Sequence, residues 1–127
     1  MPTVVRAFPL RSSVSDFEAF AQALQGPRQA EAAAFYRQYG VEHESWHLQQ
    51  TDHGPWVIVV TLVQDPGKAA PKYAKSTDQF SSWFKKQVLD LSGVDPNVAP
   101  LGPPTKQVFN WSDNEQIAST FAPFNVA

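Results

Sequence analysis

The segment 56–63 constrains the fold of this chain most strongly, because it is apolar on both faces of a strand. Its sequence is WVIVVTLV, and strands of this kind lie inside sheets that are covered on both sides. The preceding residues 42–51 alternate between two side-chain sets, which predicts a half-buried strand. The turn sequence DHGP separates the two runs, and we therefore predict a β-hairpin.

The rest of the chain supplies two helical regions and two further strands. Apolar residues at helical spacing predict a helix over 15–39, kinked or divided into two in series, and a second helix over 77–92. Alternating residues predict a first strand over 3–10 and a last strand over 105–111. The predicted order is β-α-β-β-α-β, which forms a four-stranded antiparallel sheet with both helices on one face.

The two apolar faces of segment 56–63 also predict a second copy of the chain. Helices on one side cover only one face of the sheet, and the other face needs a cover of its own. The simplest cover is the same face of another copy, so we expect a homodimer. We expect one domain over 1–111, followed by a C-terminal tail over 112–127.

Composition narrows the classes of function. The chain has 127 residues, a formal net charge of −2 and no cysteine, which excludes disulfides and thiolate metal sites. Lysine and arginine are scattered rather than gathered in a basic stripe, so we expect no nucleic-acid partner. No apolar stretch approaches the roughly 20 residues of a membrane span, and we expect a cytoplasmic protein without a membrane partner.

Two segments carry a resemblance to a known superfamily. They are residues 35–48, FYRQYGVEHESWHL, and residues 80–95, FSSWFKKQVLDLSGVD. With the hairpin between them, they resemble the dimeric α+β barrel superfamily of ferredoxin-like proteins, over roughly residues 3–111, and within it an uncharacterised group of small bacterial proteins. The resemblance implies a barrel formed by two paired sheets. Its relatives include quinol-type monooxygenases, haem-degrading enzymes and dye-decolourising peroxidases, and the fold does not choose among these activities.

Polar residues on one face of the 42–51 strand are the first candidates for a site. If Trp46 and Leu48 pack under the helices, the opposite face carries four polar side chains: His43, Ser45, His47 and Gln49. We expect further residues to complete a cavity between the two sheets: Arg6, Trp56, Trp83, Asn110 and Trp111. A few polar groups among aromatic walls suit a small apolar or aromatic molecule. The sequence therefore predicts a protein that binds such a molecule.

Two alternatives remain beside binding. The first is a cofactor-independent monooxygenase or isomerase with His47 as the base, assisted by His43 and Arg6. The second is a structural dimer without a ligand pocket. His43 and His47 lie about 13 Å apart in a strand and cannot share one ion, so we expect neither a metal site nor a cofactor.

Overall fold

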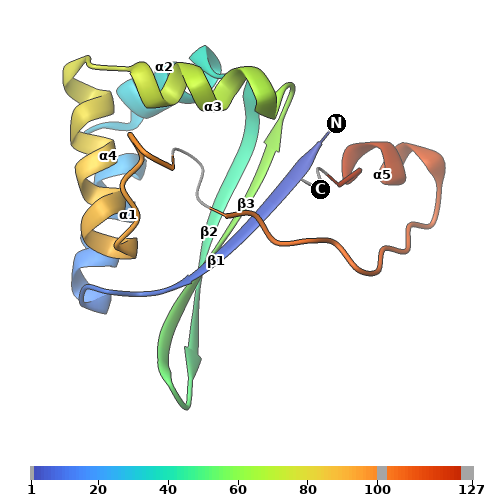
Figure 1. Ribbon diagram of the computed structural model, residues 1–127, viewed down its shortest axis with the longest axis horizontal. Coiled ribbons are helices and arrows are strands. Elements are labelled where there is room, and N and C mark those ends of the chain that lie inside the picture. Colours follow the sequence, from blue (N-terminus) through green and yellow to red (C-terminus); the bar gives the residue numbers. More distant parts are fainter. Residues whose placement is uncertain (1, 100–102, 124–127) are drawn as a thin grey trace.

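The computed structural model describes residues 2–99 and 103–123. Within them the chain is an α+β fold with an open three-stranded antiparallel sheet in the order β1-β3-β2. Four helices lie on one side of this sheet, and a fifth lies apart from them on the C-terminal segment (Figure 1). The elements in chain order are β1 (Thr3–Pro9), α1 (Val14–Gln25), α2 (Gln29–Gln38), β2 (Val41–Thr51), β3 (Gly54–Val63), α3 (Pro66–Lys75), α4 (Gln79–Ser92) and α5 (Glu115–Thr120).

The predicted hairpin is confirmed, and β3 is the central strand. Alternate residues of β3 are buried against the helices, among them Val57, Val59 and Val63. The intervening residues Ile58 and Leu62 point to the opposite side, which carries no helix, because neighbouring residues of a strand face opposite ways. We call this second side the open face. Within the described chain the open face is only partly covered.

The helices pack through a cluster of aromatic rings. Phe35 of α2 and Phe84 of α4 are 4.6 Å apart between ring centroids, and Phe20 of α1 lies 5.4 Å from Phe84. Phe20 also meets Trp46 of β2 edge-on at 5.5 Å, which ties the helices to the sheet. Offset and edge-to-face pairs of this kind add to the burial of the rings themselves.

Helix ends follow the capping chemistry of the sequence. The Ser13 hydroxyl caps α1 by accepting the Asp16 N–H, and an Asp78 carboxylate oxygen caps α4 by accepting the Ser81 N–H. Gly93 ends α4 with φ of +75°, a left-handed conformation that glycine adopts without steric cost. The region predicted to be one kinked helix or two in series consists of the two helices α1 and α2.

The predicted fourth strand is not formed within the single chain. Residues 105–111 have no strand assignment, and the described sheet has three strands. Thr105 reaches the sheet, where its N–H donates to the Val5 carbonyl at 2.8 Å. The alternation in this segment therefore marks an extended chain rather than a paired strand. No helix of the described residues is long and apolar enough to cross a membrane.

A buried lysine fastens the end of α3 to α4 and to the loop after α4. Lys85 is 5 % exposed. Its Nζ donates to the carbonyls of Ala74 and Ser76 at 3.0 and 2.8 Å and to Asn97 Oδ1 at 3.0 Å. Burial lowers the pKa of Lys85, while the carboxylates of Asp78 and Asp95 act in the opposite direction. All three ammonium hydrogens thus have an acceptor.

Replacing Lys85 by methionine should destabilise the protein by about 1–3 kcal/mol, because three acceptors lose their donor. The exposed neighbour Lys86 forms an ion pair with Asp90 on the same helix, so K86M is the matched control. We expect K86M to change the free energy of unfolding by less than about 0.5 kcal/mol. Urea unfolding measures both, and equal effects of the two variants would contradict a structural role for Lys85.

Candidate functional site

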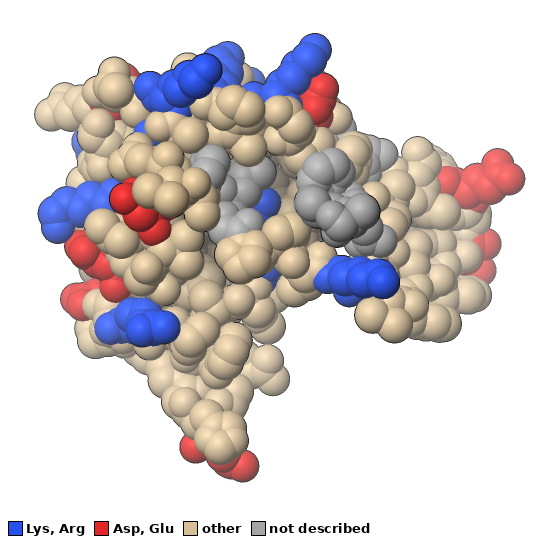
Figure 2. Space-filling view, viewed as in Figure 1, with Lys and Arg blue, Asp and Glu red and all other residues tan. Residues whose placement is uncertain are grey.

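A cavity of about 340 Å³ lies between the helices and the sheet. Its floor is the helix-facing side of the three strands, and its walls come from α2, α3 and α4. Most of its lining is apolar or aromatic. Three charged residues also line it: Arg6 and Glu44 on the sheet, and the exposed Arg11 after β1. Figure 2 shows Lys or Arg atoms at the middle of this side of the molecule.

Strand pairing places the two charges on either side of the central strand. Arg6 of β1 pairs with Val59, and Glu44 of β2 pairs with Thr61. Because strands are about 4.8 Å apart, the two backbones are separated by about 10 Å across β3. Their side chains point to the same side and lie over Val59 and Thr61, which form the floor between them.

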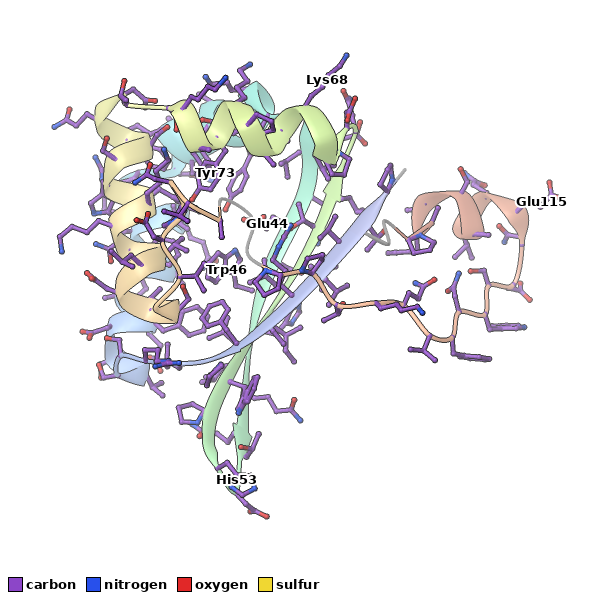
Figure 3. All side chains as sticks on the ribbon, in the orientation of Figure 1. Glu44, Trp46, His53, Lys68, Tyr73 and Glu115 are labelled. Atoms are coloured by element: carbon purple, nitrogen blue, oxygen red, sulfur yellow. The ribbon has the colours of Figure 1, made fainter. Side chains whose placement is uncertain are left out.

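Two hydrogen bonds fix the orientation of the Glu44 carboxylate. The Thr61 hydroxyl donates to Oε1 at 2.8 Å, and the Trp46 indole N–H donates to Oε2 at 3.0 Å. Figure 3 shows Glu44, Trp46 and Tyr73 in the space between the helices and the sheet, whereas His53 lies at the hairpin tip. Each carboxylate oxygen therefore has a donor, and the Tyr36 hydroxyl also hydrogen-bonds to Glu44. The remaining lone pairs are left for a proton or a ligand.

Three tyrosines border the cavity from the helices: Tyr36, Tyr39 and Tyr73. Burial raises the pKa of Tyr36 and of Tyr73 well above the usual value for a phenol, and the negative charge of Glu44 raises both further. Both phenols stay neutral at physiological pH. They therefore present hydroxyl groups, rather than charges, to the space above Glu44.

Two polar atoms at this cavity are buried without a hydrogen-bond partner among the described residues. They are Nε of Arg6 and the phenolic oxygen of Tyr39, a residue that is 7 % exposed. Burial lowers the pKa of Arg6, and the nearby Glu44 carboxylate opposes this effect. Unpaired buried donors are costly, so these two groups are the strongest polar anchors that the cavity offers a ligand.

The polar residues predicted from β2 do share one face, and it is the open face. His43, Ser45, His47 and Gln49 alternate with Glu44 and Trp46, and His47 Nε2 lies 2.9 Å from the Ser45 hydroxyl. Trp56 is opposite Gln49 on the same face. These residues lie across the sheet from the cavity, and whether they bind a ligand between two sheets stays a prediction.

The structure does not bring the other predicted site residues to that face. Arg6 points to the helix side, into the cavity, because it alternates with Val5. Trp83 belongs to α4 and packs on Phe20 at 5.7 Å, with the Arg28 guanidinium 4.3 Å above its ring. Asn110 and Trp111 lie on the exposed C-terminal segment. Arg6 therefore cannot assist His47 within one chain.

Sequence reasoning missed Glu44 and the three tyrosines. The available signal was a charge at a helix-facing position of two strands: Glu44 is on the same strand face as Trp46, and Arg6 is on the same face as Val4 and Phe8. A charged residue among core residues needs a polar partner, so each of these two positions predicts a polar site within the apolar layer. Among residues 2–99 and 103–123 no group of three or more potential metal ligands comes together.

Comparisons with known proteins found no matching family model, no matching curated protein and no matching solved structure. The antiparallel sheet with helices is compatible with a ferredoxin-like fold.

The raised tyrosine pKa values predict a loss of stability at alkaline pH. Above about pH 10 the unfolded chain releases phenolic protons that folded Tyr36 and Tyr73 retain, so the free energy of unfolding falls as pH rises through this window. Tyr73→Phe removes one such proton. Relative to wild type, we expect Y73F to gain up to about 1.4 kcal/mol per pH unit above that point.

Urea unfolding of wild type and Y73F at neutral and alkaline pH measures this difference. The neutral-pH comparison serves as the control, because Tyr73 of the wild type is then protonated and the phenylalanine of the variant carries no titratable proton, so neither chain is charged at this position. If the free energies of unfolding of the two proteins changed with pH in parallel, Tyr73 would have an ordinary phenol pKa and its hydroxyl would be solvent-exposed.

Proposed function

We propose that this protein binds a small aromatic molecule bearing an oxygen group in the cavity between its helices and its sheet. The observation that carries the proposal is the pair of buried, unpartnered donors, Arg6 Nε and the Tyr39 hydroxyl, in an otherwise apolar cavity. Ligand sites commonly combine apolar walls with a few polar groups that fix orientation. A volume near 340 Å³ is at the small end of such sites and suits one or two rings.

The polar groups favour a ligand oxygen that accepts hydrogen bonds. Arg6 donates only, Tyr39 has a free donor, and Glu44 already receives two hydrogen bonds. A phenolate, a quinol oxygen, a ketone or an aromatic carboxylate would be held by Arg6 and Tyr39. A hydroxyl on the same ligand could donate to Glu44. Phenols, quinols and small aromatic acids or ketones are therefore the favoured classes.

We further propose that the chain works as a homodimer of the dimeric α+β barrel kind. The support is the apolar open face of β3, together with the strand order β1-β3-β2, in which β1 is an edge strand that bonds to the C-terminal segment at Thr3 and Val5. In such a dimer each protomer keeps its own cavity on the helix side. A ligand between the two sheets, beside His43 and His47, would be a separate site.

Removing the Arg6 guanidinium should weaken binding of an oxygen-bearing aromatic probe. With 2-naphthol, we expect R6M to raise the Kd about 10- to 100-fold, since a hydrogen bond from a charged group is lost. Tyr39→Phe should raise it a few-fold. The probe naphthalene has no oxygen and should bind wild type and R6M alike. Ligand-detected NMR measures each affinity.

Arg37 supplies the matched control, because it is an exposed arginine of α2 outside the cavity lining. R37M should bind 2-naphthol as wild type does. If R6M bound 2-naphthol with unchanged affinity, or if Ser45→Ala and His47→Ala weakened binding instead, the ligand would lie on the open face and the proposal would fail.

Proton transfer is a second candidate function, favoured by the oriented carboxylate of Glu44 in the cavity. A carboxylate held at a bound carbonyl compound can remove a proton from the adjacent carbon and return it elsewhere, which is an isomerisation without net oxidation. Arg6 would stabilise the enolate oxygen that forms. Glu44 then takes the role that the sequence suggested for His47.

Hydrogen exchange of the ketone 2-tetralone in heavy water tests this candidate. If Glu44 is the base, wild type should accelerate deuterium uptake beside the carbonyl, and E44Q should lose at least about 100-fold of that acceleration. H47A is the competing variant. Loss of exchange in H47A with E44Q unaffected would move the chemistry to the open face.

A further inference from the structure

The segment 105–121, which we call the C-terminal arm, leaves and rejoins the outer edge of β1. At one end, Thr105 binds the Val5 carbonyl through its N–H at 2.8 Å and its hydroxyl at 2.7 Å. At the other end, the Thr3 N–H donates to the Ala122 carbonyl at 2.7 Å. Between these anchors the arm extends away from the helical layer (Figure 1).

The arm carries large apolar side chains that meet little of their own chain. Val108, Phe109 and Trp111 are 90, 84 and 73 % exposed, and Ile117 and Phe121 are also exposed. Single apolar residues on a surface need no explanation, but a run of them on one segment marks an interaction site. Figure 2 shows the arm standing off from the rest of the molecule, with an open notch beside it.

The same chain offers a surface that lacks a cover. The open face presents Val5 of β1 and Ile58, Val60 and Leu62 of β3, which point away from the helices. Trp56 lies at the hairpin end of this face. The arm and the open face are thus two apolar surfaces on one chain: large apolar side chains of the arm are exposed, and those of the open face are only partly buried.

The solvent-accessible area of the chain is larger than that of a compact monomer of the same mass. A compact folded monomer of this mass exposes about 6,700 Å², whereas this chain exposes 7929 Å². The excess of roughly 1,200 Å² per chain exceeds the roughly 800 Å² that each partner buries in a stable protein interface. Each chain therefore exposes enough extra surface to form an interface of ordinary size with a second copy.

We propose that two copies of this chain exchange arms, so that each arm packs across the open face of the other copy. The occupant is a second copy because the chain carries both complementary surfaces, and a two-fold axis lets each arm meet the other open face at once. A membrane is a poorer occupant, since Lys106 is accompanied on the arm by Asp113 and Glu115. This inference rests on the homodimer proposed above and does not depend on the cavity or its ligand.

Cross-linking of mixed variants tests the exchange. Because the chain has no cysteine, a thiol reagent reacts with the introduced cysteines alone. We would mix Asn110→Cys, on the arm, with Ser45→Cys, on the open face, and add a short bis-maleimide. Because neither variant holds both cysteines, a dimer cross-linked between them requires an arm on the other copy. Glu18→Cys, exposed on α1 of the helical side, replaces Ser45→Cys in the control mixture and should give little product.

Sedimentation of arm variants gives the second readout. The double variant Phe109→Ser with Trp111→Ser should weaken dimerisation at least 100-fold, whereas Val98→Ser, an exposed valine outside the arm, should leave it unchanged. A monomeric wild type at micromolar concentration would overturn the proposal. So would a dimer that survives the double variant, since its sheets would then pair without the arms, or equal cross-linking with Glu18→Cys.

Discussion

The two apolar faces of β3 are the constraint on which the rest of the structure depends. On one face Val57, Val59 and Val63 are buried beneath helices of the same chain. On the other face Ile58 and Leu62 have no helix above them. Exposing either face of such a strand to water would destabilise the fold, so the strand must lie at the centre of a sheet and needs two covers. One cover is intramolecular, and the chain's layout leaves the other open.

The cavity exists because two charges occupy helix-facing positions beside this strand. Burying an ionised group without partners costs several kcal/mol, so the helices cannot close over Arg6 and Glu44 as they do over the valines. Thr61 and Trp46 satisfy the carboxylate. Nothing in the described chain satisfies Arg6 Nε. An apolar pair of similar size would pack the same layer more stably, which is why we attribute these charges to binding rather than to stability.

Alternation along the strands predicted the hairpin, the first strand and the side of the sheet on which Trp46 lies. It failed at residues 105–111, because alternation describes an extended segment and does not say what pairs with it. Arg6 was assigned to the wrong face relative to His47 although its own alternation with Val5 was clear. Which residues of β1 share a sheet face with which residues of β2 depends on how both strands pair with β3. A single sequence does not specify this pairing register. The helix tyrosines gave no signal, since aromatic residues at helical spacing also describe an ordinary core.

The cavity and the arm meet at one short stretch of chain. Ala99 and Pro103 line the cavity, and the arm begins two residues after Pro103. If a second copy holds the arm, it also restrains the backbone that borders the cavity. Ligand binding and dimerisation would then be thermodynamically linked, and linkage is reciprocal: a ligand that favours one position of this border strengthens the dimer by the factor with which the dimer strengthens ligand binding. The central strand thus connects a closed apolar layer, where we propose that the ligand binds, with an open one, where we propose that the partner packs.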